Sequence, residues 1–230
     1  MLSIVIPVLD ERELLEKAIP QVLRAASALP VPFEIIIASD GPGCFSAGEM
    51  FSMSDSRIIH THSDIRRGKG GAISDALSIA KGDLFCFFDV DLSTDLKHLS
   101  EMVSALSAYD IVIGSRTASG SSVSRSLLRR TASHGYIAYV KHMLGISVSD
   151  FQCGFKGFKT AVLKELSASC AERGWAWDTE VLAYAMRSKC SIYELPVIWN
   201  AGAGTKLRIT DAYRMARAVR RIRGRMNAEK

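Results

Sequence analysis

The first half of the chain alternates short apolar runs with longer segments of helical periodicity. The apolar runs have the length of buried strands and lie at residues 3–7, 33–38, 57–60, 83–88 and 110–114. Between them, apolar residues recur every three to four positions, which predicts helices at residues 11–29, 69–80 and 95–106. Pro20 falls inside the first helix, so we expect a kink or a break there. Because strands joined through helices usually pair in parallel, the pattern predicts an α/β fold with a mainly parallel central sheet flanked by helices.

The second half has a less regular pattern. Helical spacing returns at residues 126–144 and 178–187, and a late strand is expected at 194–199. Residues 151–159 are rich in aromatic residues and glycine, and 201–204 is expected to be a loop. There is no internal repeat, low-complexity linker or shift in composition, so we expect one domain over residues 1–230.

Composition adds three constraints. Of the residues, 48% are hydrophobic and 23% charged, as in ordinary globular domains. No apolar stretch approaches the roughly 18 residues of a membrane span, and the N-terminus lacks the pattern of a signal peptide. The five cysteines form no CxxC pair, which indicates reduced thiols and argues against a structural zinc. We therefore expect a cytoplasmic location.

The net charge of +5 is concentrated at the C-terminal end. Residues 206–230 carry nine basic and two acidic side chains, whereas the rest of the chain carries 20 and 22. Residues 210–230 are also helical in spacing, with apolar positions at Tyr213, Ala216, Val219, Ile222 and Met226. Two interpretations stay open: a helix lying peripherally on an anionic membrane surface, or one packed on its own domain with its arginines in water. No interleaved aromatic residues support nucleic-acid binding, so we expect none.

Acidic residues follow three of the expected strands. They are Asp10 and Glu11 after the first, Asp40 after the second, and Asp89 and Asp91 after the fourth. Residues i and i+2 of a strand point to the same side, so Asp89 and Asp91 can converge on one cation. Two carboxylates completed by phosphate and water oxygens suit Mg²⁺ or Mn²⁺. The alternative is that these aspartates only form turns and helix caps.

A glycine-rich segment, RGKGG at residues 67–71, precedes the helix expected at 69–80. Glycines such as Gly70 let a backbone approach phosphate closely, the helix start offers free N–H groups, and Lys69 adds a positive charge. The segment lacks the spacing of a Walker A loop and of the GxGxxG fingerprint. A phosphate-binding loop and an ordinary loop both remain open on this motif alone.

Taken as an ordered series, these motifs resemble those of the family 2 glycosyltransferases of the GT-A fold. The matching segments are VIPVLDE at 5–11, ASDG at 38–41, RGKGG at 67–71, FDVDLS at 88–93 and GSR at 114–116. The second half is most similar to the dolichyl- and polyprenyl-phosphate glucosyltransferase and mannosyltransferase group. There the matching segments are DFQCGFK at 150–156, close to the DTQCGFK signature, with WDTE at 177–180, ELPVIW at 194–199 and GTK at 204–206.

The resemblance implies an inverting, metal-dependent transfer of a hexose from a nucleotide sugar to a polyprenyl phosphate. UDP-glucose is the first expectation for the donor, and GDP-mannose the second. Residues 1–116 would bind nucleotide sugar and metal, 117–205 the acceptor, and 206–230 would form a basic helix. Asp89 and Asp91 would hold Mg²⁺ or Mn²⁺. The residues expected to bind substrate are Pro7, Asp10, Glu11, Asp40, Lys69, Gly70, Asp89, Arg116, Arg129 (or Arg130), Gln152, Trp177 and Lys206.

Asp178 is the residue on which the acceptor class depends. With a hydroxyl acceptor it would be the general base, whereas with an already ionised phosphate it would position acceptor or sugar; helix capping is the alternative to both. Two residues depart from the family pattern: Asp10 stands where the family usually has Asn, and Phe151 replaces Thr. A hydroxyl-acceptor transferase and a non-catalytic nucleotide-sugar-binding protein are the rival functions; the retained Asp89 and Asp91 pair argues against the second.

Overall fold

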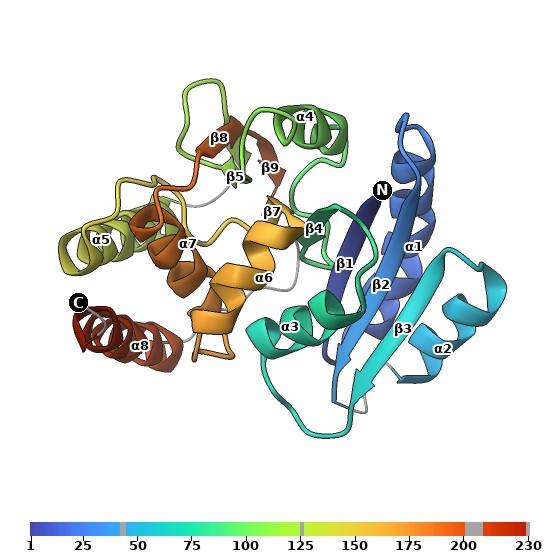
Figure 1. The fold of residues 1–230 in the computed structure, drawn as a ribbon, viewed down its shortest axis with the longest axis horizontal. Coiled ribbons are helices and arrows are strands. Elements are labelled where there is room, and N and C mark those ends of the chain that lie inside the picture. Colours follow the sequence, from blue (N-terminus) through green and yellow to red (C-terminus); the bar gives the residue numbers. More distant parts are fainter. Residues whose placement is uncertain (42–44, 125–126, 201–208, 229–230) are drawn as a thin grey trace.

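The computed structural model describes residues 1–41, 45–124, 127–200 and 209–228, with all their side chains except those of residues 45–46, 127–134 and 209–212. A seven-stranded sheet runs through the centre in the order β3-β2-β1-β4-β7-β5-β8 (Figure 1). Its strands are β1 (Leu2–Val8), β2 (Phe33–Asp40), β3 (Ile58–Ser63), β4 (Leu84–Phe88), β5 (Ile111–Ser115), β7 (Phe155–Lys159) and β8 (Ile192–Pro196).

The sheet is mainly parallel, as the alternation of strands and helices predicts. β1 pairs in parallel with β2 and β4, β2 with β3, and β5 with β8. The exception is β7, which lies antiparallel between β4 and β5. The sequence pattern did not predict β7 as a strand, yet this inserted strand brings the QCGFK segment beside the end of β4.

Helices cover both faces of the sheet. On one face lie α1 (Arg12–Ser27), α2 (Phe45–Ser54) and α4 (His98–Ala105). On the other lie α3 (Lys69–Ile79), α6 (Thr160–Ser169) and α7 (Trp177–Arg187). Outside α7 pack α5 (Leu127–Leu144) and α8 (Ile209–Ala228), at the opposite end of the molecule from α2 and β3 (Figure 1). Two apolar cores result, one on each side of the sheet.

Two local expectations need correction. α1 runs unbroken through Pro20, which sits exposed on the solvent side of that helix. The strand expected at 194–199 is two strands: β8 ends at Pro196, and β9 (Ile198–Asn200) pairs with β6 (Ser122–Ser124) in a separate small sheet. The helices α2 and α6 were not predicted, and the loop expected at 201–204 lies outside the described residues.

The basic C-terminal helix α8 is packed onto its own domain. Its Val219 and Ile222 are buried in the core cluster that includes α5 and α7, and Ala218 is buried as well. Arg225 also binds the fully buried carboxylate of Glu180 at 2.6 Å. The structure thus shows α8 packed on its own domain through Val219 and Ile222. Tyr213 of the same helix is exposed. No described helix is both long and apolar enough to cross a bilayer.

Candidate functional site

The carboxyl ends of β1, β2 and β4 lie at the same edge of the sheet, because these neighbouring strands are parallel. Pro7 lies in β1 beside Ala38 of β2 and is partly buried. Asp10 and Glu11 follow β1 and are exposed, and Glu11 accepts a hydrogen bond from the Leu9 amide at 2.8 Å. These three predicted residues are therefore near the edge where such sheets bind ligands.

Asp40, at the end of β2, holds the glycine-rich segment in place. Its buried carboxylate accepts hydrogen bonds from the backbone N–H groups of Arg67 at 2.5 Å and Gly68 at 2.8 Å. Gly68 has a φ of 86°, and a Cβ there would lie 2.8 Å from the carbonyl oxygen of Arg173. The segment is thus fixed between Asp40 and the loop before α7, and Asp40 has a structural task besides the predicted contact with nucleotide.

Asp89 and Asp91 line one small pocket, whose other lining residues include Thr94, Gly154 and Trp199. They do not lie in a strand as the i, i+2 argument assumed. β4 ends at Phe88, and the chain then turns, with Leu92 at a φ of 47° donating its N–H to the Asp89 carbonyl. The two aspartates are therefore brought to the same pocket by a tight turn. Asp91 accepts hydrogen bonds from the N–H and the hydroxyl of Ser93 at 3.0 and 2.7 Å.

Gly154 provides the space for Asp89. The Asp89 N–H donates to the Gly154 carbonyl at 3.1 Å, so the two backbones are in direct contact. A Cβ at position 154 would lie 1.9 Å from Oδ2 of Asp89, far inside any allowed contact. The glycine of the QCGFK segment therefore has a physical role at the site, which the sequence comparison alone did not reveal.

Lys69, the first residue of α3, points its ammonium group at this pocket. Its Nζ lies 2.8 Å from Oδ1 of Asp89 and 3.6 Å from Oδ2 of Asp178, and the side chain is only 9% exposed. The rings of Phe87 and Trp175 flank the ammonium group at 5.3 Å each. Burial disfavours its charge, but the carboxylates of Asp178 and Asp89 outweigh this and raise the pKa of Lys69 above its ordinary value.

Asp178 lies between two lysines. Its other oxygen, Oδ1, accepts a hydrogen bond at 2.7 Å from Lys156 of β7, whose side chain is 1% exposed. Asp178 is the second residue of α7, and the residue at the N-cap is Ala176, so helix capping does not explain it. Asp89, Lys69, Asp178 and Lys156 thus form a chain of alternating charges. Lys156 is a site residue that the sequence analysis missed, because only the fold brings it to Asp178.

Arg116, expected to grip phosphate, is instead engaged by a protein carboxylate. Its guanidinium binds both oxygens of the buried Asp150 at 2.7 and 2.8 Å and lies over the ring of Trp199. Burial disfavours ionisation of Asp150, but Arg116 outweighs it and lowers the pKa of that carboxyl. Gln152 donates to the hydroxyl of Thr179 at 3.1 Å. The Arg116 contact ties the end of β5 to the segment before β7, and the Gln152 contact ties that segment to α7.

Gly70 and Trp177 pack against each other inside the protein. A Cβ on Gly70 would lie 2.3 Å from that of Trp177, which is 1% exposed. The expectation that they contact substrate therefore finds no support, and close packing of α3 on α7 explains both. Of the remaining candidates, the side chain of Arg129 and the whole of Lys206 lie outside the described part of the chain.

The donor set at this edge fits a divalent cation that is completed by its substrate. Among the described residues, no group of three or more His, Cys, Asp or Glu side chains is arranged to hold a metal. Asp89 and Asp91 offer two hard carboxylates in one pocket, and Mg²⁺ is often bound by one or two carboxylates together with substrate phosphates and water. The residues present are therefore suited to Mg²⁺ or Mn²⁺ in the presence of a diphosphate.

Comparison with solved structures defines the fold. Glucosyl-3-phosphoglycerate synthase of Mycobacterium tuberculosis, solved with Mn²⁺, UDP and glucosyl-3-phosphoglycerate, superposes with a TM-score of 0.70 at 16% identity, covering 96% of this chain and 78% of that one. The mannosyltransferase PcManGT of Pyrobaculum calidifontis, solved with GDP-Man and Mn²⁺, gives 0.57 at 19% identity, covering 94% and 60%. The fold is therefore GT-A, as expected.

Sequence relatives define the family. The model of glycosyl transferase family 2 matches residues 3–167, and the chain belongs to this family. Glycosyltransferase AglD of Haloferax volcanii is 35% identical over 211 residues, covering 89% of this chain and 34% of that protein. The dolichyl-phosphate beta-glucosyltransferase of Saccharomyces cerevisiae is 27% identical over 215 residues, covering 83% and 64%. The chain thus spans about a third of the first relative and somewhat under two thirds of the second.

Proposed function

We propose that this protein transfers a hexose from a nucleoside-diphosphate sugar to a polyprenyl or dolichyl phosphate, with inversion at the sugar carbon. UDP-glucose is the favoured donor, because relatives covering most of this chain are named dolichyl-phosphate beta-glucosyltransferases. A fold neighbour solved with UDP and Mn²⁺, and another solved with GDP-Man and Mn²⁺, support a nucleotide-sugar donor and a divalent metal.

The observation that carries the choice of acceptor is the position of Asp178 between two ammonium groups. Lys156 lies 2.7 Å from one of its oxygens, and Lys69 lies 3.6 Å from the other. Both oxygens of Asp178 therefore already face an ammonium group, so neither is left free to receive a proton from an acceptor. A hydroxyl acceptor needs such a base, whereas a phosphate monoester is already an ionised nucleophile at neutral pH. The geometry therefore favours a phosphate acceptor.

The residues of the pocket divide the remaining work. Asp89 and Asp91 would hold Mg²⁺ or Mn²⁺, which as a Lewis acid neutralises charge on the departing diphosphate. Lys69 adds a positive charge beside the same pocket, and the half-exposed ring of Trp175 lies against its ammonium group. Gly154 keeps the carboxylate of Asp89 in its position. Asp178 fixes the direction of Lys69 rather than taking a proton.

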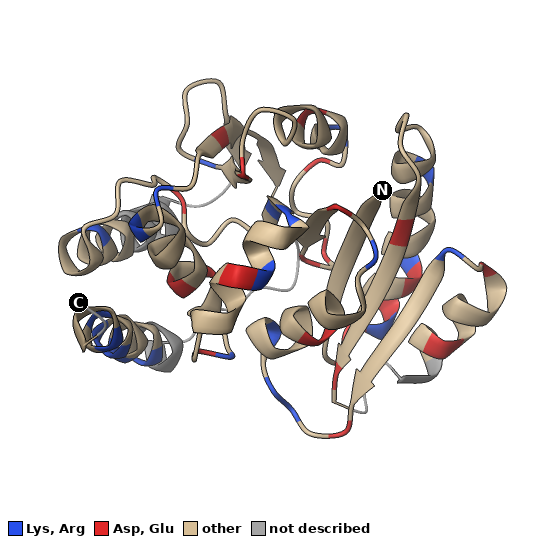
Figure 2. Cartoon of the chain, in the orientation of Figure 1, with Lys and Arg blue, Asp and Glu red and all other residues tan. Residues whose placement is uncertain are grey.

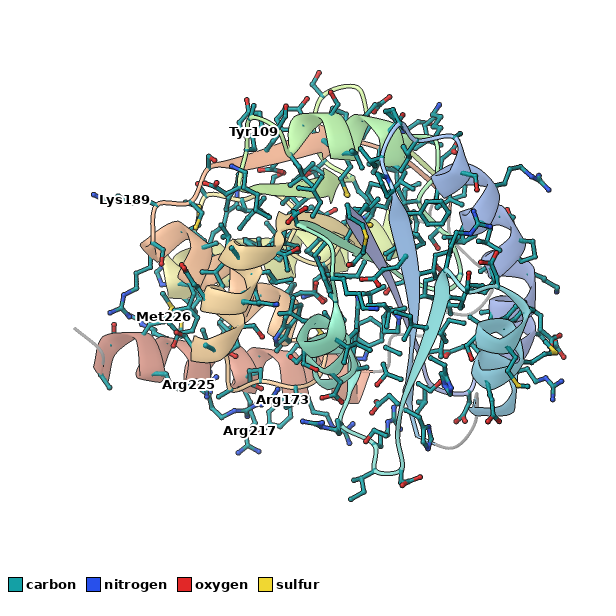
Figure 3. All side chains as sticks on the ribbon, turned by 45° about the vertical axis from the view of Figure 1, so that its right-hand side comes forward. Tyr109, Arg173, Lys189, Arg217, Arg225 and Met226 are labelled. Carbon is teal, nitrogen blue, oxygen red and sulfur yellow. The ribbon has the colours of Figure 1, made fainter. Side chains whose placement is uncertain are left out.

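We also propose that α8 gives the protein a peripheral contact with anionic membrane. Figure 2 shows basic residues along most of this helix, and Figure 3 shows Arg217 projecting from it, away from the domain. Arg217 and Arg220 are exposed, while Val219 and Ile222 are buried, so the contact would be mainly electrostatic. Each basic residue near an anionic surface contributes about 1 kcal/mol. Such a contact would bring the site close to a lipid acceptor.

The test is a transfer assay with radiolabelled donors, a short polyprenyl phosphate and Mn²⁺ or Mg²⁺. UDP-glucose and GDP-mannose are offered separately, and Asp91→Ala serves as the metal-site control. We expect label to enter the lipid fraction from UDP-glucose, and to be lost with the variant or with a chelator. Transfer from GDP-mannose alone would show that GDP-mannose, and not UDP-glucose, is the donor. Metal-dependent nucleotide binding without lipid product would move the search to hydroxyl acceptors.

A further inference from the structure

Lys69 occupies the position at which a cation would reach Asp89. Its Nζ lies 2.8 Å from Oδ1 of that carboxylate. The other oxygen, Oδ2, faces the backbone of Gly154, where a Cβ would lie only 1.9 Å away. A cation approaching Asp89 therefore meets the ammonium group of Lys69. Asp91 differs, since its carboxylate accepts hydrogen bonds from the N–H and hydroxyl of Ser93.

A second carboxylate for Lys69 lies nearby. Oδ2 of Asp178 is 3.6 Å from Nζ, and its partner oxygen is held at 2.7 Å by Lys156. Between these two carboxylates the ammonium group is flanked by the flat rings of Phe87 and Trp175, both at 5.3 Å. Aromatic faces attract a cation without fixing it at one point. Lys69 can thus move from one carboxylate to the other without losing a negatively charged neighbour.

From this arrangement we infer that Lys69 is the built-in counter-ion of the metal carboxylate Asp89. A divalent cation that binds to Asp89 displaces the ammonium group of Lys69 toward Asp178. The inference rests on the metal role proposed above for Asp89 and Asp91. Its physical reason is charge. Without metal, two carboxylates and two ammonium groups balance each other, and a buried charge left unpaired is strongly destabilising. Adding a divalent cation repels Lys69 from Asp89, and Asp178 is the carboxylate placed to receive it.

The experiment measures the affinity for Mn²⁺ alone, without nucleotide, by electron paramagnetic resonance of free Mn²⁺. Lys69→Met removes the competing ammonium group and should bind Mn²⁺ about tenfold more tightly than the unchanged protein. Asp178→Asn removes the second carboxylate, so Lys69 stays on Asp89 and Mn²⁺ should bind several-fold more weakly. Lys159→Met is the matched control: it lies on β7 near Lys156 but pairs with Asp110 at 3.0 Å, and its affinity should not change.

A Mn²⁺ affinity that rises in Lys69→Met and falls in Asp178→Asn distinguishes a counter-ion from a lysine with a purely structural role. Equal or weaker Mn²⁺ binding by Lys69→Met overturns the inference, as does an absence of binding to both proteins. If Asp178→Asn does not fold, tryptophan emission of the unchanged protein gives a second test. Mn²⁺ should alter the emission of Trp175, which is identified as the part of the spectrum lost in Trp175→Phe, because the ammonium group of Lys69 beside that ring moves. An emission that Mn²⁺ leaves unchanged contradicts the inference. The Mn²⁺ experiments contain no sugar donor or acceptor, so their outcome does not depend on whether the protein transfers sugar. A failure of this inference can therefore be distinguished from a failure of the proposed function.

Discussion

Replacing Gly154 by alanine tests the most crowded contact at the site. The added Cβ would lie 1.9 Å from Oδ2 and 2.4 Å from Cγ of Asp89, whereas real contacts of this kind essentially never fall below 3.0 Å. The carboxylate or the backbone of Gly154, just before β7, must therefore shift by about 1 Å. Both are held, the carboxylate by Lys69 at 2.8 Å and the backbone by the hydrogen bond from the Asp89 N–H at 3.1 Å.

The expected magnitude has two parts. Overpacking of this kind costs about 1–3 kcal/mol, which for a chain of this size lowers Tm by roughly 2–10 °C. Displacing a group of the reacting site by about 1 Å can reduce turnover by about a hundredfold. Gly154→Ala should therefore melt moderately earlier, yet lose about two orders of magnitude in metal-dependent transfer and bind Mn²⁺ more weakly.

The assay compares melting, Mn²⁺ binding and transfer for Gly154→Ala and a control in α8. Gly224→Ala is the control, because a Cβ there meets nothing within 4 Å. Alanine in a helix interior is favoured over glycine by about 0.5–1 kcal/mol, so this variant should be slightly more stable and fully active. If Gly154→Ala keeps both its melting temperature and its Mn²⁺ affinity, the steric argument is wrong.

Three further substitutions test other parts of the molecule. Arg225→Met leaves the buried carboxylate of Glu180 without its cation and should cost about 3 kcal/mol in chemical denaturation; a loss below 1 kcal/mol would refute the pairing. Arg116→Lys cannot reproduce the two-point contact with Asp150 and should cost about 2 kcal/mol without preventing folding, measured in the same way. Hydrogen bonds from the backbone and side chain of Ser191 lower the pKa of Asp110 to about 2. Because a lowered pKa stabilises the fold only while the group is ionised, Asp110→Asn should be less stable at pH 7, and the difference should disappear as the pH falls from about 4 to about 2.

The sheet was predictable from the sequence because strand and helix periods differ. The apolar run at 84–88 becomes β4, and the two aspartates that follow it line one pocket. The geometry by which they meet was not predictable, since a strand argument cannot foresee a turn with Leu92 at a positive φ. The antiparallel insertion of β7 was also missed, because its partners β4 and β5 come earlier in the chain and local pattern does not encode that pairing.

The same limit applies to the charges of the site. Lys156 and Asp178 are 22 positions apart, and only the packing of α7 on β7 brings them to 2.7 Å. Arg116 looked like a phosphate ligand because guanidinium suits phosphate, yet Asp150 matches it equally well and is supplied by the chain itself. Residue type predicted which side chains carry chemistry, but not which of them are already satisfied by a neighbour. The spacing in α8 predicted an apolar side correctly, and the fold decided what covers it.

The acceptor is the central claim, and a matched pair of lipids tests it most directly. Transfer from radiolabelled UDP-glucose with Mn²⁺ is measured to a short polyprenyl phosphate and to the corresponding polyprenol, which differ only in the phosphate. Asp178→Asn is run beside the unchanged protein. We expect product from the phosphate alone, and measurable turnover in Asp178→Asn, because the nucleophile needs no base. Product from the polyprenol that disappears in Asp178→Asn would contradict the account and make Asp178 a general base.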